Sequence, residues 1–203
     1  MPREGVTLVL LAAGRAKRMG RPKLDLDIDG RTLLQRALDA CARHPTIVVV
    51  SEDSAAVLRR STVPPTLCGV VRQLHPEQGL ASSARLGAKA APADVAVGIV
   101  LADRPFLRAE IVDRTVARYR EGAAEIVYPV VEGIPAHPVI FGPAMRARLE
   151  SCPDGESLQG LRDAEGVVVE RVAIDDPGAL FDIDTEEDLE RARMWAEHGV
   201  AGP

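Results

Sequence analysis

The 203-residue sequence has few aromatic residues, few cysteines and little lysine. Aromatic residues make up 3% of the chain while apolar residues make up 46%, so a core must consist mainly of Leu, Val, Ile and Ala. Cys41, Cys68 and Cys152 are too few and too widely spaced for a disulfide framework or a zinc site. We therefore expect reduced thiols and a cytoplasmic protein.

Long apolar runs and a basic charge balance are also absent. No apolar run reaches the roughly 20 residues that a membrane-spanning helix requires, and the first residues lack a signal-peptide pattern, so we expect no membrane association. The formal net charge of −5 disfavours a nucleic-acid partner, because contacts with the phosphate backbone dominate that kind of affinity. The length suits one domain spanning residues 1–203.

Two common nucleotide-binding signatures are missing. Five residues separate Gly14 from Gly20 and Arg21 follows, so the sequence contains no GxxxxGK[ST] motif. It contains no GxGxxG motif either. These absences exclude a P-loop NTPase and a Rossmann dinucleotide-binding protein.

The sequence does contain a basic loop after its first apolar segment. Five basic residues and no acidic residue lie between Arg15 and Lys23, and two of the three lysines are among them. Glycine allows the main chain to approach a ligand, main-chain N–H groups can point at an anion, and Lys or Arg neutralises its charge. We expect Lys23 and Arg18 to contact a triphosphate, and Arg15, Lys17 and Arg21 to form a solvated rim.

Apolar segments alternate with helical patterns along the chain, which predicts a three-layer α/β fold with a mostly parallel sheet. The run Val95–Leu101 is continuously apolar, as is typical of a strand buried on both faces. Strands are expected at Val6–Leu11, Thr46–Val50, Gly69–Val71, Val95–Leu101, Glu125–Val130, Pro138–Phe141 and Gly166–Val172. Helices are expected at Thr32–Ala42, Ser54–Arg60, Leu80–Ala91, Ala109–Gly122, Pro143–Ser151, Ser157–Glu165 and Glu186–His198, with a loop or hairpin at Val131–Pro138.

Three aspartates are candidate Mg²⁺ ligands. Asp103 follows the continuously apolar strand and should lie at its carboxyl end, where open α/β sheets bind ligands, although it also fits a helix cap. Asp182 and Asp184 are two residues apart, which on an extended segment directs both carboxylates to one face. Either could complete a Mg²⁺ site with Asp103, and the spacing does not choose between them. Thr185 and Asp188 also fit the start of a capped helix.

The segments Leu11-Ala12-Ala13-Gly14, Arg18-Met19-Gly20 and Pro22-Lys23 together resemble the LAAGxxxRMGxxK motif of nucleotidyltransferases. Within that superfamily the sequence is most similar to the MobA-like NTP transferases, particularly the molybdenum cofactor cytidylyltransferases. This resemblance implies a nucleotide-diphospho-sugar-transferase-like, Rossmann-like fold. It also implies that Leu11, Ala12, Ala13 and Gly14 bind the nucleotide.

Four further segments resemble elements of the same family, in the same order: Gly79-Leu80-Ala81-Ser82-Ser83, Leu101-Ala102-Asp103-Arg104-Pro105, His137-Pro138-Val139-Ile140-Phe141 and Asp182-Ile183-Asp184-Thr185-Glu186-Glu187-Asp188-Leu189. The resemblance implies that Ser82 and Ser83 hold the base and ribose, although serines also suit any helix N-terminus. It implies that Asp103 binds nucleotide and metal, and that His137 lies near the acceptor, although a position before Pro also fits a simple turn.

The sequence departs from the family pattern at a few positions. Ala16 and Lys17 stand where Ser or Gly is usual, Ala136 replaces the Gly before His137, and Glu186 stands where Pro is common. None of these departures removes a charge that the chemistry requires.

The resemblance implies transfer of a nucleoside monophosphate from an NTP to a phosphate monoester, with release of pyrophosphate. The acceptor phosphate, with a second pKa of about 6, needs no general base. Ala13, where guanylyltransferases usually have Gly, favours CTP, with molybdopterin-bound molybdenum as the acceptor and a molybdoenzyme or cofactor-insertion protein as a further partner. The alternatives are GTP or UTP with a sugar 1-phosphate or phospholactate, or a non-catalytic nucleotide-binding module.

Overall fold

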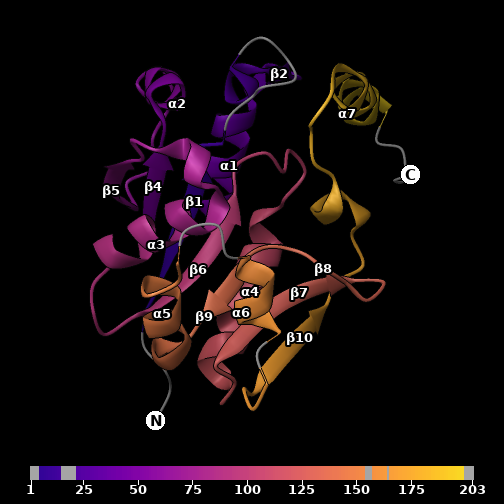
Figure 1. Cartoon of the computed structure of the whole chain (residues 1–203). Helices are drawn as coiled ribbons and strands as arrows, with labels where there is room; N and C mark the ends of the chain where they lie inside the picture. The colour runs from indigo at the N-terminus through magenta and orange to yellow at the C-terminus, as the bar shows by residue number, and fades with distance from the viewer. Residues whose placement is uncertain (1–4, 15–21, 154–156, 164, 199–203) are drawn as a thin grey trace.

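The computed structural model describes residues 5–14, 22–153, 157–163 and 165–198. Its main sheet has eight strands, seven of them in the order β10-β7-β9-β6-β1-β4-β5, with β8 paired to β7 (Figure 1). Their bounds are β1 Val6–Ala12, β4 Thr46–Val50, β5 Leu67–Arg72, β6 Ala96–Leu101, β7 Ile126–Val131, β8 Ile134–Pro135, β9 Val139–Phe141 and β10 Val169–Ala173. Strand β9 is antiparallel to both β6 and β7, while β5, β4, β1 and β6 are parallel. The expected mostly parallel sheet is confirmed.

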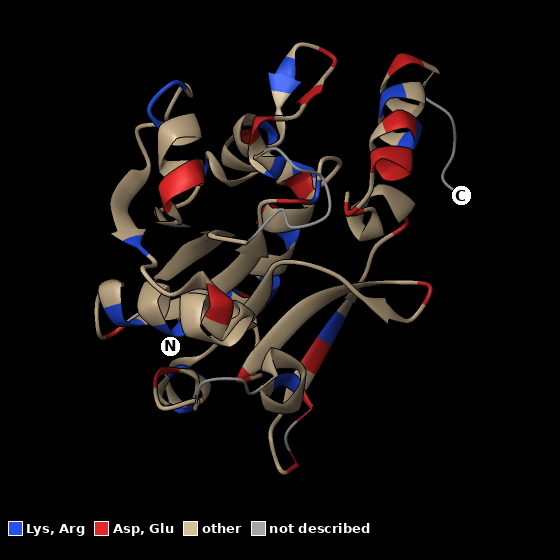
Figure 2. Cartoon of the chain, turned by 45° about the horizontal axis from the view of Figure 1, so that its top comes forward, with Lys and Arg blue, Asp and Glu red and all other residues tan. Residues whose placement is uncertain are grey.

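Helices cover both faces of this sheet. They are α1 Leu33–Cys41, α2 Glu52–Leu58, α3 Leu80–Ala90, α4 Ala109–Glu121, α5 Pro143–Glu150, α6 Leu158–Arg162 and α7 Glu186–His198. One apolar cluster joins α1, α2, α4 and α7 to one face, and a second joins α3 and α5 to the other. The middle strands carry almost no charge (Figure 2), because β1, β4 and β6 are buried between these two layers.

Every expected strand and helix is present, with ends displaced by at most three residues, as at β10 (Gly166 expected, Val169 observed). Helix α2 begins before the expected Ser54, because Ser51 is its cap and Ser54 completes a capping box with Ser51. The expected loop or hairpin at Val131–Pro138 is the β7–β8 hairpin.

A second hairpin was not expected. Strands β2 (Asp27–Ile28) and β3 (Arg31–Thr32) are joined by Asp29 and Gly30, both with positive φ (54° and 73°). An Asp-Gly pair is a frequent two-residue turn for such a connection.

Two sets of tertiary contacts hold helices α3 and α7 in place. Arg146 of α5 is 5% exposed and donates hydrogen bonds to backbone carbonyls at the carboxyl end of α3, including those of Ala88 (2.8 Å) and Ala91 (2.9 Å). Trp195 of α7 packs its ring against Phe106 and Phe181, with centroids 4.7 and 5.3 Å away. The aromatic cluster Phe106–Phe181–Trp195 therefore fastens α7 to the loop that follows β6.

Strand β1 has β4 on one side and β6 on the other, and Leu11 pairs with Leu101 at the carboxyl ends of β1 and β6. The chain order reverses here, and open α/β sheets bind ligands in the crevice at such a point. Within the described ranges, no helix is both long and apolar enough to cross a membrane.

Candidate active site

A cavity of about 180 Å³ lies at the carboxyl ends of β1 and β6. Its walls are Leu11, Ala12, Gly14, Pro22, Lys23, Leu24, Ser51, Asp53, Ser54, Asp103 and Asp184. The structure therefore brings together, from four separate segments, most of the residues that the sequence assigned to nucleotide and metal.

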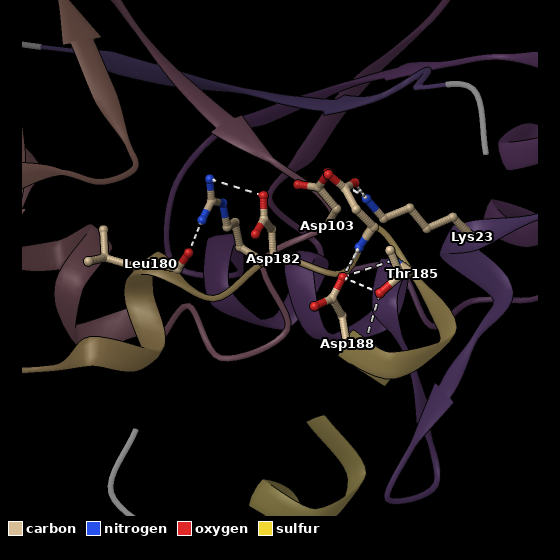
Figure 3. Close-up of polar contacts among 8 residues, drawn as sticks. Lys23, Asp103, Leu180, Asp182, Thr185 and Asp188 are labelled. Carbon is tan, nitrogen blue, oxygen red and sulfur yellow. Dashed lines mark hydrogen bonds and ion pairs between the residues drawn. The ribbon is translucent and has the colours of Figure 1, made fainter. Parts of the chain in front are cut away.

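Lys23 lies at the centre of this cluster. It begins a short 3-10 turn, η1 (Lys23–Asp25), which is anchored by the buried side chain of Leu24. The Lys23 ammonium donates to Asp103 Oδ2 at 3.0 Å and to Asp184 Oδ1 at 2.8 Å. Figure 3 shows the Lys23 side chain extending toward the Asp103 carboxylate. Its cation thus bridges two carboxylates that come from distant parts of the chain.

This bridge keeps Lys23 charged. Burial alone would lower the pKa of its ammonium, but Asp103 and Asp184 outweigh burial and the pKa is raised. The Lys23 side chain is only 14% exposed, against 31% for Asp103 and 57% for Asp184. The site therefore holds one partly buried cation with an excess of negative charge around it.

Asp103 lies two residues beyond β6 and has an unused oxygen. Its Oδ2 accepts from Lys23, whereas its Oδ1 is buried and has no hydrogen-bond partner in the described structure. A buried carboxylate oxygen without a partner costs free energy unless a ligand satisfies it. It suits a hard cation, which binds through oxygen.

Asp184 is held by the start of α7. The Asp188 carboxylate accepts from the backbone N–H groups of Asp184 (3.0 Å) and Thr185 (2.9 Å), and Thr185 Oγ1 accepts from the Asp188 N–H (3.1 Å). Burial would raise the pKa of Asp188, but these hydrogen bonds outweigh it and lower the pKa. The expected cap formed by Thr185 and Asp188 is confirmed, and it fixes the backbone that carries Asp184.

Asp182 and Asp184 share the exposed side of the segment between η3 (Pro177–Leu180) and α7, as expected, because Phe181 and Ile183 between and beside them are buried. Their ion pairs differ, since Asp184 contacts Lys23. The Asp182 carboxylate instead lies 3.7 Å from the Arg104 guanidinium, and Arg104 also donates to the Leu180 carbonyl (Figure 3).

The sequence left open which of Asp182 and Asp184 joins Asp103 at a metal. Among the described residues, no three His, Cys, Asp or Glu side chains come together in a way that could hold a metal ion. Lys23 contacts both Asp103 and Asp184, while Arg104 pairs with Asp182. Asp103 and Asp184 still fit Mg²⁺, which in many sites uses one or two carboxylates together with substrate phosphates.

Ser82 and Ser83 do not cap α3, which was the alternative to their contact with a nucleotide. Helix α3 begins at Leu80 after Gly79, which has a φ of 89° and makes no side-chain cap. Both serines are buried, and the Gln73 amide donates to their hydroxyls at 3.1 and 3.4 Å. Neither serine lines the Lys23 cavity, so their contact with a nucleotide stays a prediction.

The remaining loop residues divide into three groups. Leu11, Ala12 and Gly14 line the cavity, as expected of nucleotide-binding residues. Ala13 is 2% exposed and belongs to the apolar cluster under α3 and α5. Arg18, with the rim residues Arg15, Lys17 and Arg21, lies outside the described residues.

His137 lies in a different cavity, of about 260 Å³, next to β6 and β9. Its Nδ1 is 3.1 Å from the carbonyl oxygen of Ile99. Burial lowers the pKa of His137 to about 4, so the ring is neutral at physiological pH. His137 therefore does not line the Lys23 cavity, and its role with an acceptor stays a prediction.

Sequence reasoning missed Ser51, Asp53 and Ser54, which line the Lys23 cavity, and also Arg104. The first three directly follow β4, which is buried and pairs with β1. A polar cluster after a buried strand was the available signal, because neighbouring parallel strands end at the same edge. Nothing in the sequence marked Arg104 as a residue of the site apart from its position directly after Asp103.

Known protein sequences are similar to this chain over most of its length. The sequence model of the MobA-like NTP transferase domain matches residues 8–169. A nicotine blue oxidoreductase of Paenarthrobacter nicotinovorans is 28% identical over 196 residues, covering 92% of this chain and 95% of that protein. A molybdenum cofactor guanylyltransferase of Rhizobium johnstonii is 29% identical over 201 residues, covering 93% and 92%. A bifunctional enzyme IspD/IspF of Bradyrhizobium diazoefficiens is 37% identical over 139 residues, covering 63% of this chain but 33% of that protein.

Solved structures share the fold. Rv0371c from Mycobacterium tuberculosis H37Rv superposes with a TM-score of 0.81 at 22% identity, covering 95% of this chain and 99% of that one. Its manganese complex gives a TM-score of 0.76 at 21% identity, covering 94% and 99%. Molybdopterin-guanine dinucleotide biosynthesis protein A from Archaeoglobus fulgidus gives 0.70 at 18% identity, covering 94% and 98%. The expected nucleotide-diphospho-sugar-transferase fold is confirmed.

Proposed function

Because the chain belongs to the MobA-like NTP transferase family, we propose that it transfers CMP from CTP to a phosphate monoester, with molybdopterin-bound molybdenum as the acceptor. The general reaction class, nucleotidyl transfer of the MobA and IspD kind, follows from the family and its relatives. The observation that best supports a catalytic site is the Lys23 ammonium between Asp103 and Asp184 at the carboxyl ends of β1 and β6.

The reaction joins an oxygen of the acceptor phosphate to the α-phosphorus of the NTP. The bond from the α-phosphorus to the bridging oxygen of the β-phosphate breaks, and pyrophosphate leaves with that electron pair. The acceptor phosphate is already largely ionised at neutral pH, so no side chain has to remove a proton. The protein has to align the two reactants and neutralise negative charge.

The residues of the Lys23 cavity divide this work. Lys23 leaves its two carboxylates to contact the triphosphate, and Leu11, Ala12 and Gly14 offer backbone at the end of β1. Asp103 and Asp184 would hold Mg²⁺, with the free Asp103 Oδ1 as one ligand atom. When bound, Mg²⁺ stabilises the charge on the α-phosphate and the leaving pyrophosphate.

The choice of CTP rests on Ala13 and on the resemblance to cytidylyltransferases. The Rhizobium johnstonii relative is a guanylyltransferase, so GTP is the nucleotide against which CTP has to be tested. The test is a thermal-shift comparison of the four NTPs, each with and without Mg²⁺, followed by pyrophosphate release. A ligand at 100 times its Kd adds about 2.7 kcal/mol to the free energy of unfolding. A Mg²⁺-dependent shift largest with CTP supports the proposal, and a shift largest with GTP rejects the choice of nucleotide.

A redox reaction is a second candidate, because the relative that covers 92% of this chain is named an oxidoreductase. The chain has no GxGxxG motif for a dinucleotide. Oxidation of NADH or NADPH, followed by absorbance with and without a quinone-like dye, separates the two candidates. The Lys23→Met variant should slow nucleotidyl transfer by about 10²- to 10³-fold, with Lys89→Met on the exposed side of α3 as its matched control.

A further inference from the structure

The cavity beside His137 has mainly apolar walls. Ile99, Val139 and Phe141 of the sheet and Leu80 of α3 form much of its surface, and its volume of about 260 Å³ suits a compact ring or a short chain. Its charged side chain, Arg162, is bound by both oxygens of Asp163, at 2.8 and 2.9 Å, and lies over the Tyr128 ring. The charged side chain of the wall is therefore already paired with a carboxylate.

The hydrogen bond of His137 determines which of its nitrogens carries the proton. The Ile99 carbonyl can only accept, so Nδ1, 3.1 Å away, must be the donor. In a neutral imidazole the other nitrogen, Nε2, then has a free lone pair. No hydrogen bond from the described residues occupies Nε2.

The charged groups near His137 keep the ring neutral. Burial disfavours the imidazolium, as do the Arg104 and Arg162 guanidinium groups, while Asp103 and the Ile99 carbonyl act in the opposite direction. The balance lowers the pKa to about 4, so a cationic His137 is a minor species above pH 5.

We propose that His137 selects the acceptor by accepting, at Nε2, a hydrogen bond from an N–H or O–H group on its uncharged body, and that it does not bind the acceptor's phosphate. This inference rests on the proposed function, because it needs a phosphate monoester as the second substrate. The apolar walls favour an acceptor whose body is a compact heterocycle with N–H donors, and a polyol with O–H donors is the other source of the same contact. His137 is thus a specificity-determining residue.

The first experiment measures the proton on His137 directly, without any nucleotide. Long-range ¹H–¹⁵N spectra of the histidine-labelled wild-type protein are recorded from pH 5.5 to 8, and the His137 signal is identified by its loss in His137→Gln. The expected result is a neutral ring with its proton on Nδ1 throughout. A proton on Nε2, or protonation with a midpoint near 6.5, would overturn the proposal.

The second experiment compares two acceptors in CTP-dependent pyrophosphate release. Pterin-6-ylmethyl phosphate carries N–H donors, glycerol 3-phosphate carries O–H donors, and methyl phosphate serves as a control without donors. His137→Leu should raise KM for a donor-bearing acceptor roughly 3- to 10-fold, the value of one hydrogen bond, and leave the Kd of CTP unchanged. His137→Gln, whose amide oxygen can accept, should stay within about 3-fold of wild type.

Each outcome has a stated meaning. A larger effect of His137→Leu on the pterin ester than on glycerol 3-phosphate identifies the N–H heterocycle as the source. An equal rise in KM for methyl phosphate would show that His137 binds phosphate and would overturn the proposal. If a protein that binds CTP transfers to none of the three, the proposed function fails in its acceptor, whereas the spectra still decide the state of His137.

Discussion

Replacing Lys23 by methionine should change catalysis and metal binding in opposite directions. The substitution keeps most of the side-chain volume but removes the ammonium, which lies 3.0 Å from Asp103 Oδ2 and 2.8 Å from Asp184 Oδ1. Loss of the cation that neutralises the triphosphate should lower kcat by about 10²- to 10³-fold, as for other preorganised electrostatic contacts.

Metal binding without nucleotide should become tighter in the same variant. At a separation near 3 Å a unit charge is worth about 1.4 kcal/mol per contact at the dielectric constant of water, and more where the pair is buried. Two such contacts correspond to roughly 100-fold in the affinity for a divalent cation, because the cation no longer competes with the ammonium. The exposure of Asp103 (31%) and Asp184 (57%) makes the value for water the appropriate one.

The assay is a titration of free Mn²⁺ by electron paramagnetic resonance at fixed ionic strength, with pyrophosphate release measured on the same preparations. Lys89→Met removes the same charge from the surface of α3 and should change neither quantity. Near-wild-type kcat in Lys23→Met would refute the role of Lys23 with the triphosphate. Unchanged Mn²⁺ affinity would refute the view that its ammonium competes with a cation for Asp103 and Asp184.

Four further substitutions or conditions test the structure. Arg146→Met should lower the free energy of unfolding by about 3 kcal/mol, because the carbonyls at the end of α3 lose a buried donor; urea denaturation measures it. Gly79→Ala should lower the free energy of unfolding by about 1–3 kcal/mol through backbone strain alone, because φ is 89° and the added Cβ meets no atom within 4 Å. Thermal denaturation measures it, with Gly160→Ala, whose Cβ also meets no atom within 4 Å, as the control. The lowered pKa of Asp188 stabilises the fold at pH values above the ordinary pKa of an aspartate, and this stabilisation is lost as the pH falls below that value. Acid should therefore weaken the α7 cap only in that range, and Asp188→Asn should flatten the slope of stability against pH. The half-buried, neutral His137 should make the protein less stable as pH falls from 6.5 to about 4, by up to about 3 kcal/mol, and His137→Gln should remove that dependence.

Each of these predictions has a contradicting result. Arg146→Met within 0.5 kcal/mol of wild type would mean that solvent replaces the guanidinium at the α3 carbonyls. A Gly79→Ala protein as stable as wild type would contradict the positive φ. A slope of stability against pH that survives in either Asp188→Asn or His137→Gln would assign the titration to other groups.

The strands could be predicted from the sequence because a strand that is buried on both faces consists of a continuous apolar run, as at Val95–Leu101. The direction of β9 could not, because its apolar pattern is the same in parallel and antiparallel pairing. The Asp29-Gly30 turn carried a local signal and was available to sequence reasoning.

Many residues of the candidate site could be predicted from the sequence, but the contacts between them could not. Asp103 follows β6 and the loop that leads to Lys23 follows β1, and the carboxyl ends of these two strands are adjacent, so topology suggested the proximity of Lys23 and Asp103. The bridge formed by the Lys23 ammonium joins residues 80 and 161 positions apart, which no local pattern encodes. The ion pair of Asp182 with Arg104 follows from tertiary packing. So do the hydrogen bonds of Ser82 and Ser83 with Gln73.

The aromatic cluster Phe106–Phe181–Trp195 allows assembly of the site to be followed by fluorescence. Trp195 is the chain's single tryptophan, and it packs on Phe106 just past the loop of Asp103 while its own helix carries the cap that positions Asp184. A chain emerging from the ribosome lacks this closure until α7 has been synthesised, so the cation site is completed last. Intrinsic fluorescence at one position therefore reports whether α7 has docked on the loop that follows β6.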